Sequence, residues 1–186
     1  MEEQTGKLLL DSDRFHLMIE RLCHQLMEDW GDMRDACIVG IQQRGVFVAD
    51  RLHKRLTELT GNPNIDYGKL DITFYRDDFR LRNKPLTPHP NDIDFLMDDK
   101  KVLLVDDVLY TGRTIQAALA ALQHYGRPRL VELLVLVDRR FNRHLPIQPD
   151  YVGLHVDALD EAYVKVRWLE KHGKDEILLF EFRPDA

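Results

Sequence analysis

The segment KVLLVDDVLYTGRT at residues 101–114 limits the fold more than any other part of the chain. Residues 101–105 are mostly apolar, as in a buried strand, and two acids, Asp106 and Asp107, follow them. Apolar residues then recur at helical spacing over residues 115–122. A buried strand that leads through a polar turn into a helix is the repeating unit of a parallel α/β sheet.

Two further segments have the same character. Residues 36–41 (ACIVGI) predict a short buried strand, which a glycine-containing turn joins to apolar residues at helical spacing over 48–59. Residues 130–137 (LVELLVLV) predict the next buried strand. We therefore expect an α/β fold with a central parallel sheet flanked by helices.

The first part of the chain predicts a helix. Apolar residues recur at three- and four-residue steps from Phe15 to Trp30, with Ser12 or Asp13 available as the N-cap. Later, apolar and polar residues alternate over residues 70–75, which predicts a strand whose two faces differ.

The C-terminal part changes character. Residues 151–156, 163–169 and 176–182 predict short strands, and KHGKD at 171–175 predicts a hairpin turn between the last two. These strands form either a small β-rich subdomain or an extra edge of the main sheet.

Residues 76–99 contain three prolines and many aspartates without an apolar period. Loops of this length inside a compact domain are usually functional, so we expect a mobile loop over a site, with a solvated linker as the alternative.

Length and charge exclude several classes of protein. The chain has 186 residues and a formal net charge of −6, so we expect one domain without general attraction to polyanions. The acidic, polar start MEEQTGK is unlike a signal peptide, and apolar stretches are too short to span a membrane, which predicts a cytoplasmic protein. The eight histidines lack the spacing of metal ligands, and we predict no metal held by protein side chains alone.

The turn after the acid pair has residue types that suit a sugar phosphate. Backbone N–H groups that open a helix lie at the positive end of its dipole and can bind a phosphate. Gly112 permits a close turn, and the two carboxylates can accept hydrogen bonds from a diol such as the ribose hydroxyls. An acid pair that merely ends a strand is the alternative, which the full string VDDVLYTGRT disfavours.

The string resembles the phosphate-binding loop of the type I phosphoribosyltransferases. The resemblance continues through RLCHQL, VGIQQRGV, LDITFYRDDF and LVDRR with LPIQPDYVG, so it covers nearly the whole chain. Within the family, the chain is most similar to the pyrimidine operon regulators that double as uracil phosphoribosyltransferases. The resemblance implies a single phosphoribosyltransferase domain over residues 1–186, with a flexible loop at about 76–99 and a small β-rich hood over about 138–186.

The resemblance also implies roles for individual residues. Asp106 and Asp107 would hold the ribose hydroxyls, and Arg76 in the flexible loop would complement the pyrophosphate charge. The residues implied at the two phosphate groups of 5-phosphoribosyl-1-pyrophosphate (PRPP) are Thr111, Gly112, Arg113 and Thr114 for the 5′-phosphate and Gln43, Arg44 and Gly45 for the pyrophosphate. The residues implied near the base are Asp138, Arg139, Tyr163 and Val164.

The activity implied is conversion of uracil and PRPP, carried with Mg²⁺, to UMP and pyrophosphate. A purine phosphoribosyltransferase acting on hypoxanthine or guanine, or a regulator with little catalysis, remains an alternative. The resemblance further implies a homodimer or homotetramer and UMP-responsive binding of pyrimidine-operon leader RNA. The candidate basic residues for RNA are Arg14, Arg21, His24, Arg139, Arg140, Arg143 and His144.

Overall fold

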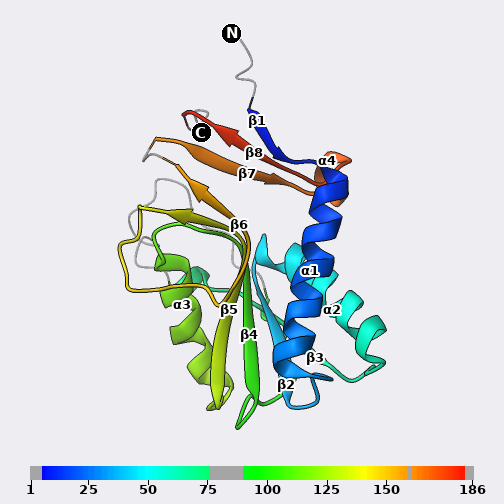
Figure 1. Ribbon diagram of the computed structural model, residues 1–186. Coiled ribbons are helices and arrows are strands. Elements are labelled where there is room, and N and C mark those ends of the chain that lie inside the picture. The colour runs from blue at the N-terminus through cyan, green and yellow to red at the C-terminus, as the bar shows by residue number, and fades with distance from the viewer. Residues whose placement is uncertain (1–5, 76–89, 159–160, 183–186) are drawn as a thin grey trace.

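The computed structural model describes residues 6–75, 90–158 and 161–182. Five parallel strands form the main sheet in the order β3-β2-β4-β5-β6. Three antiparallel strands form a smaller sheet in the order β1-β8-β7, which lies over one end of the main sheet (Figure 1). The expected α/β class with a central parallel sheet and a small β-rich hood is confirmed.

The elements have the following bounds. The main sheet contains β2 (Ala36–Ile41), β3 (Asp66–Leu70), β4 (Lys101–Leu109), β5 (Leu130–Arg140) and β6 (Tyr151–Asp157). The smaller sheet contains β1 (Lys7–Leu10), β7 (Tyr163–Arg167) and β8 (Glu176–Phe180). The helices are α1 (Ser12–Trp30), α2 (Gly45–Thr60), α3 (Arg113–Leu122) and α4 (Leu169–His172), with 3₁₀ turns at Thr73–Tyr75 and Gln123–Tyr125.

The main sheet is covered on both faces. Helices α1 and α2 pack on one face and α3 on the other (Figure 1), so the central strand β4 is buried along most of its length. One apolar core lies under α1 and α2 and includes Val164, Val166 and Ile177 of the hood, while a second lies under α3. Since the first core includes side chains of both sheets, the hood packs directly on the main sheet.

An aromatic cluster fixes the hood to the start of α2. The Trp168 ring stacks on Phe47 with 5.2 Å between the ring centroids, and the guanidinium of Arg51 lies 5.2 Å from the Trp168 ring. Arg51 also donates to carboxylates of Glu170 at 3.0 Å and Asp175 at 2.8 Å. The position of α2 therefore depends on the hood, which becomes important because the turn before α2 carries Arg44.

The strand predicted over residues 70–75 is wrong. Strand β3 ends at Leu70, and a 3₁₀ turn occupies Thr73–Tyr75. The Asp71 side chain accepts a hydrogen bond from the backbone N–H of Thr73 at 2.7 Å, which turns the chain directly after the strand. Alternation of apolar residues did not reveal this, because a carboxylate that bonds its own backbone competes with strand pairing.

Two other local features differ from the sequence predictions: the N-cap of α1 and the segment that forms α4. Helix α1 is capped by Asp11, whose carboxylate accepts from the Arg14 N–H at 2.9 Å, and not by Ser12 or Asp13. The segment expected as a hairpin turn is partly helical, since α4 runs to His172 before Gly173 adopts a left-handed conformation. The C-terminal strands divide between the two arrangements expected: β6 extends the main sheet, and β7 and β8 form the hood with β1.

Part of the expected loop at 76–99 is described and is packed. Lys69 and Asp92 form an antiparallel bridge, and Met97 is fully buried with its N–H donating to the Tyr125 carbonyl. Residues 76–89, which include Arg76, lie outside the described residues. No helix of the part described is both long and apolar enough to cross a membrane.

A close backbone approach between the start of α2 and β4 gives a stability prediction. A Cβ added at Gly45 would lie 2.4 Å from the Val105 carbonyl oxygen, a contact with backbone that cannot rotate away. We expect Gly45→Ala to lower the free energy of unfolding by about 1–3 kcal/mol. Urea denaturation measures this change.

Gly61→Asn is the matched control. Gly61 ends α2 in a left-handed conformation, with φ of 66°, and a Cβ there would meet nothing within 4 Å. Asparagine tolerates that conformation, so the free energy of unfolding should change by less than about 0.5 kcal/mol. Equal effects of the two substitutions would contradict the proposed close approach.

Candidate active site

The acid pair lies in the second half of the central strand β4. Asp106 and Asp107 are each 6% exposed. The Asp106 Oδ1 accepts the Asp107 N–H at 2.9 Å, and the Asp107 Oδ1 accepts the Val108 N–H at 2.8 Å. The buried Oδ2 of Asp107 has no hydrogen-bond partner among the described residues. A buried carboxylate oxygen without a donor is suited to accept a hydroxyl of a bound ligand.

The turn after β4 forms an anion-binding geometry. Gly112 is the N-cap of α3, with φ of 91°, and has no side chain to cap the helix. A side-chain acceptor near this start is the Thr111 hydroxyl, which lies 3.5 Å from the Arg113 backbone nitrogen. The Thr111 carbonyl accepts the His144 N–H at 3.0 Å, and a Cβ at Gly112 would lie 3.3 Å from the Ile147 side chain. The first N–H groups of a helix have no partner within it, so the start of α3 is a place where an anion can bind.

Arg44 faces the acid pair from the turn between β2 and α2. Its Nη1 lies 4.0 Å from the Asp107 Oδ2, and the guanidinium also hydrogen-bonds the Tyr163 hydroxyl of β7. The peptide bond between Gln42 and Gln43 in this turn is cis. The site thus brings a cation beside the free carboxylate oxygen, with a contact to the hood.

The local charges determine the pKa directions. Burial raises the pKa of Asp106 well above its usual range, and the neighbouring Asp107 charge raises it further. Burial also raises the pKa of Asp107, although the Arg44 guanidinium and backbone N–H groups act in the opposite direction. For Arg44, burial would lower the pKa, but Asp107 and Tyr163 outweigh it and raise the pKa overall.

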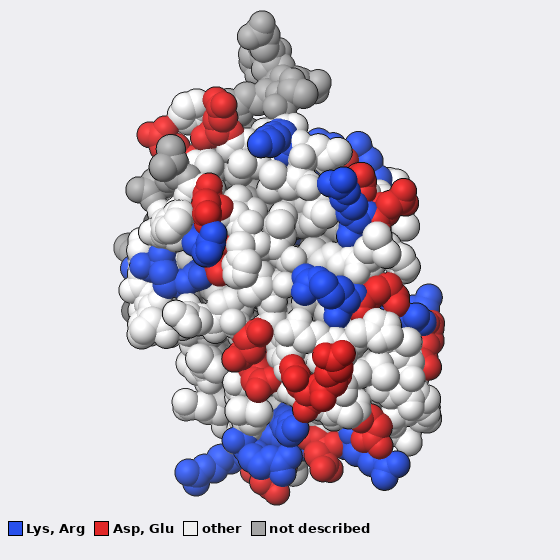
Figure 2. Space-filling model, in the orientation of Figure 1, with Lys and Arg blue, Asp and Glu red and all other residues white. Residues whose placement is uncertain are grey.

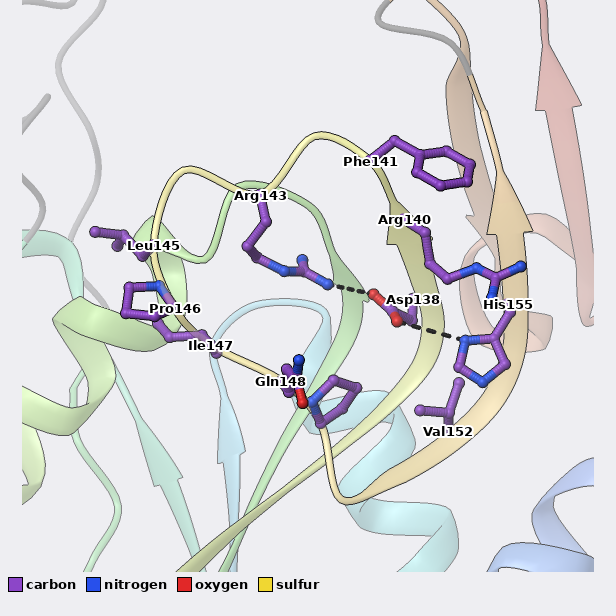
Figure 3. A pocket seen from close by; sticks show the side chains of 11 residues that line it. Asp138, Arg140, Phe141, Arg143, Leu145, Pro146, Ile147, Gln148, Val152 and His155 are labelled. Carbon is purple, nitrogen blue, oxygen red and sulfur yellow. Dashed lines mark hydrogen bonds and ion pairs between the residues drawn. The ribbon is translucent and has the colours of Figure 1, made fainter.

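The residues expected near the base do not all point the same way. Asp138 is buried between Arg143, in the loop after β5, and His155 of β6, whose Nδ1 lies 3.4 Å from the Asp138 Oδ2 (Figure 3). These three side chains help to line a cavity of about 470 Å³. The Val164 side chain is buried in the core under α1 and α2, so only its backbone is available to a ligand.

Arg139 contacts the turn between β4 and α3. Its guanidinium carbon lies 4.0 Å from the centroid of the Tyr110 ring, and the residue is only 5% exposed. Sequence reasoning missed this contact and the one between Asp138 and His155. The register between β5 and β6, which places His155 opposite Asp138, follows from strand pairing and has no local sequence signal.

The groups present fit a sugar phosphate. The Asp107 Oδ2 can accept a hydrogen bond from a hydroxyl, and the start of α3 offers N–H donors for a phosphate. Arg44 adds a positive charge beside Asp107. Within residues 6–75, 90–158 and 161–182, no group of three or more His, Cys, Asp or Glu side chains is arranged to hold a metal ion.

Comparison with known proteins identifies the class. The phosphoribosyl transferase domain family matches residues 6–171, and the chain belongs to this family. The fold is similar to a hypoxanthine phosphoribosyltransferase from Staphylococcus aureus, with a TM-score of 0.69, 20% identity and coverage of 97% of this chain and 94% of that one. A hypoxanthine-guanine phosphoribosyltransferase from Bacillus anthracis gives a TM-score of 0.70 at 15% identity, covering 96% and 99%.

Sequence similarity is much higher to one group within the family. The chain is 44% identical to the bifunctional protein PyrR of Alkaliphilus metalliredigens, over 92% of this chain and 93% of that protein. It is 39% identical to the bifunctional protein PyrR of Bacillus cereus, over 96% of this chain and 99% of the relative. The similarity to the purine enzymes thus shows the fold alone, whereas the PyrR proteins resemble the chain along almost its whole length.

The raised pKa values of the acid pair predict a pH-dependent stability. The folded protein holds these protons more tightly than the unfolded chain, so stability should fall as the pH rises from the ordinary aspartate pKa through the raised ones. Asp106→Asn cannot ionise there, and we expect it to be more stable than the wild type at neutral pH. The difference should vanish below about pH 4, where unfolded aspartate is protonated.

Urea denaturation between about pH 4 and pH 8 measures this effect. The exposed Asp94 provides the control, because Asp94→Asn should keep the pH profile of the wild type. Parallel profiles for the wild type and Asp106→Asn would show that the acid pair is not held in an unusual protonation state.

Proposed function

We propose that this chain is a uracil phosphoribosyltransferase, which transfers the phosphoribosyl group of PRPP to uracil and releases UMP and pyrophosphate. The observation that carries the proposal is the buried Oδ2 of Asp107, which has no hydrogen-bond partner among the described residues and lies 4.0 Å from Arg44. The strand that carries it leads through Gly112 into α3. Identity of about 40% to PyrR proteins over most of the chain favours this branch over the purine enzymes.

The two ends of PRPP have separate partners in the proposal. The start of α3 binds the 5′-phosphate through backbone N–H groups, which need no side-chain cap because the ligand supplies the negative charge. The turn before α2 binds the pyrophosphate. The residues assigned are Thr111, Gly112, Arg113 and Thr114 at the 5′-phosphate and Gln43, Arg44 and Gly45 at the pyrophosphate, with Arg76 added from the loop outside the described residues.

The acid pair acts on the ribose. Asp106 and Asp107 accept hydrogen bonds from the 2′ and 3′ hydroxyls and hold C1 in place for attack by a uracil nitrogen. As the bond to pyrophosphate breaks, positive charge develops on the sugar ring, and carboxylates nearby stabilise it. Mg²⁺, held by the oxygens of PRPP, neutralises charge on the leaving group when bound. Arg44 adds positive charge on the same side.

The base binds under the hood. The groups assigned to the base, following the family resemblance, are Asp138, Tyr163 and the backbone of Val164. Arg139, expected in the same place, instead has its guanidinium over the Tyr110 ring. The Tyr163 hydroxyl bonds Arg44, which links the hood to the pyrophosphate turn.

An assay of base preference tests the proposed activity. The purified protein is incubated with PRPP, Mg²⁺ and, separately, uracil, orotate, hypoxanthine, guanine and xanthine, and nucleotide products are quantified by chromatography. We expect UMP from uracil and little product from the other bases. A purine nucleotide as the main product would keep the PRPP site and overturn the base assignment.

Asp107→Asn tests the role of the acid pair. The amide keeps the size of the side chain but lacks the charge that stabilises the sugar, so we expect turnover to fall by roughly 100-fold. Thermal denaturation should show a folded protein. The exposed Asp94→Asn is again the control, and unchanged turnover in Asp107→Asn would disprove the proposed contact with the ribose.

RNA binding is a second candidate activity. The relatives are named bifunctional, and Arg14, Leu17, Arg21 and His24 lie exposed on the outer face of α1. The Arg21 guanidinium bonds the neutral Val152 and Gly153 carbonyls, so its charge is not cancelled by an acid. On the face that Figure 2 shows, however, basic and acidic side chains are interspersed.

Two other candidate cations for RNA have acidic partners. The Arg140 guanidinium donates to both oxygens of Asp157 at 2.6 and 2.7 Å, and Arg143 pairs with Asp138. Paired arginines offer less net charge to phosphates. We therefore place the RNA contact on the outer face of α1 and expect it to respond to UMP.

Charge removal on α1 tests the RNA proposal. Arg14→Gln and Arg21→Gln should each weaken binding of a pyrimidine-operon leader hairpin and reduce its salt slope by about one. Filter binding over a series of salt concentrations, with and without UMP, gives both quantities. Arg55→Gln is the control, because Arg55 pairs with Glu20 and Glu58. Equal affinity for random RNA of the same length would exclude specific regulation.

A further inference from the structure

The last residues of β5 and the loop after it hold the phosphate-binding turn at three points. The Arg139 guanidinium lies over the Tyr110 ring at 4.0 Å, Arg143 donates to the Tyr110 carbonyl, and the His144 N–H donates to the Thr111 carbonyl at 3.0 Å. Tyr110 and Thr111 directly precede the glycine that opens the turn into α3. The conformation of this turn therefore depends on contacts from a different strand.

The contact through Arg139 has the geometry of a strong cation–π pair. A guanidinium carbon 4.0 Å from the ring centroid is well within the range of about 6 Å at which such pairs attract. Arg139 is 5% exposed, so little water competes with the ring for its charge. Tyr110 is 36% exposed, so its side chain is only partly covered by the protein.

We propose that Arg139 is a positioning residue for the phosphate-binding turn, acting through the Tyr110 ring, and not a residue that recognises the base. The inference rests on the proposed function, in which the start of α3 binds the 5′-phosphate. Register places Asp138 beside Leu109 on β4, so the next residue of β5 reaches the chain where it leaves β4. Arg139 thereby fixes the direction in which the N–H groups of the turn point.

Variants of the pair separate the ring from the hydroxyl. Tyr110→Leu removes the ring and should weaken binding of ribose 5-phosphate about tenfold, and Arg139→Gln should do the same. Tyr110→Phe keeps the ring and should bind like the wild type. Arg139→Gln added to Tyr110→Leu should cause little further loss, because the two side chains form one contact.

Ribose 5-phosphate is the probe because it contains the phosphate and the ribose without pyrophosphate or base. Isothermal titration gives its affinity, and steady-state kinetics give the KM for uracil at saturating PRPP, which should change less than about twofold. Lys101→Gln is the matched control. Lys101 begins β4, at the other end of the strand from the turn, and its Nζ lies 5.5 Å from the centroid of the Trp30 ring. This variant should leave both values unchanged.

A second measurement is independent of catalysis. Hydrogen exchange of the peptide covering residues 109–116 in the ligand-free protein should be faster in Arg139→Gln and Tyr110→Leu than in the wild type or Tyr110→Phe. If the wild type makes no UMP, the proposed function fails, while hydrogen exchange still decides the positioning role. Since Tyr110 is partly exposed, its leucine variant tests the contact even if Arg139→Gln does not fold.

Two results would overturn the proposal. A raised KM for uracil in Arg139→Gln with unchanged affinity for ribose 5-phosphate would make Arg139 a base contact. Unchanged exchange of the turn in Tyr110→Leu would show that the ring does not hold it.

Discussion

Burial of two adjacent carboxylates is the constraint on which the rest of the site depends. Each acid is 6% exposed, and the loss of water raises the pKa of both. The charge of Asp107 raises the pKa of Asp106 further. The fold offsets this cost only in part. Backbone N–H groups donate to the Oδ1 of each acid, and Arg44 lies 4.0 Å from the Oδ2 of Asp107. The rest of the burial cost can be offset by a ligand that donates hydrogen bonds from its hydroxyls and carries a bound cation.

The position of Arg44 follows from packing at both ends of its turn. On one side, Gly45 lets the start of α2 approach the Val105 carbonyl more closely than any side chain would permit. On the other side, Phe47 stacks against Trp168 of the hood. The Tyr163 hydroxyl bonds the guanidinium itself. The cation that faces the acid pair is thus held by the main sheet and by the hood, so a shift of the hood would move it.

Sequence patterns predicted strands, helices and turns, because these features depend on residues that are close together in the chain. Apolar runs predicted β2, β4 and β5 of the main sheet, and the string around Asp106 and Asp107 predicted an acid pair that leads into a turn and a helix. Alternation failed at residues 70–75, because the Asp71 carboxylate bonds the backbone and turns the chain. Contacts between neighbouring strands, such as Asp138 with His155, required the register of the sheet and were not predictable.

The same limit applies to Arg139, whose contact with Tyr110 had no local sequence signal. Adjacent positions in a strand point to opposite faces, so Asp138 and Arg139 cannot both face one ligand through their side chains. Asp138 lies against His155 and Arg143, while Arg139 reaches the Tyr110 ring. A family motif names residues that lie close in sequence, but the pleat of β5 divides them between the cavity and the turn before α3. Substitutions at Asp138 and Arg139 would therefore act on the cavity and on that turn by separate routes.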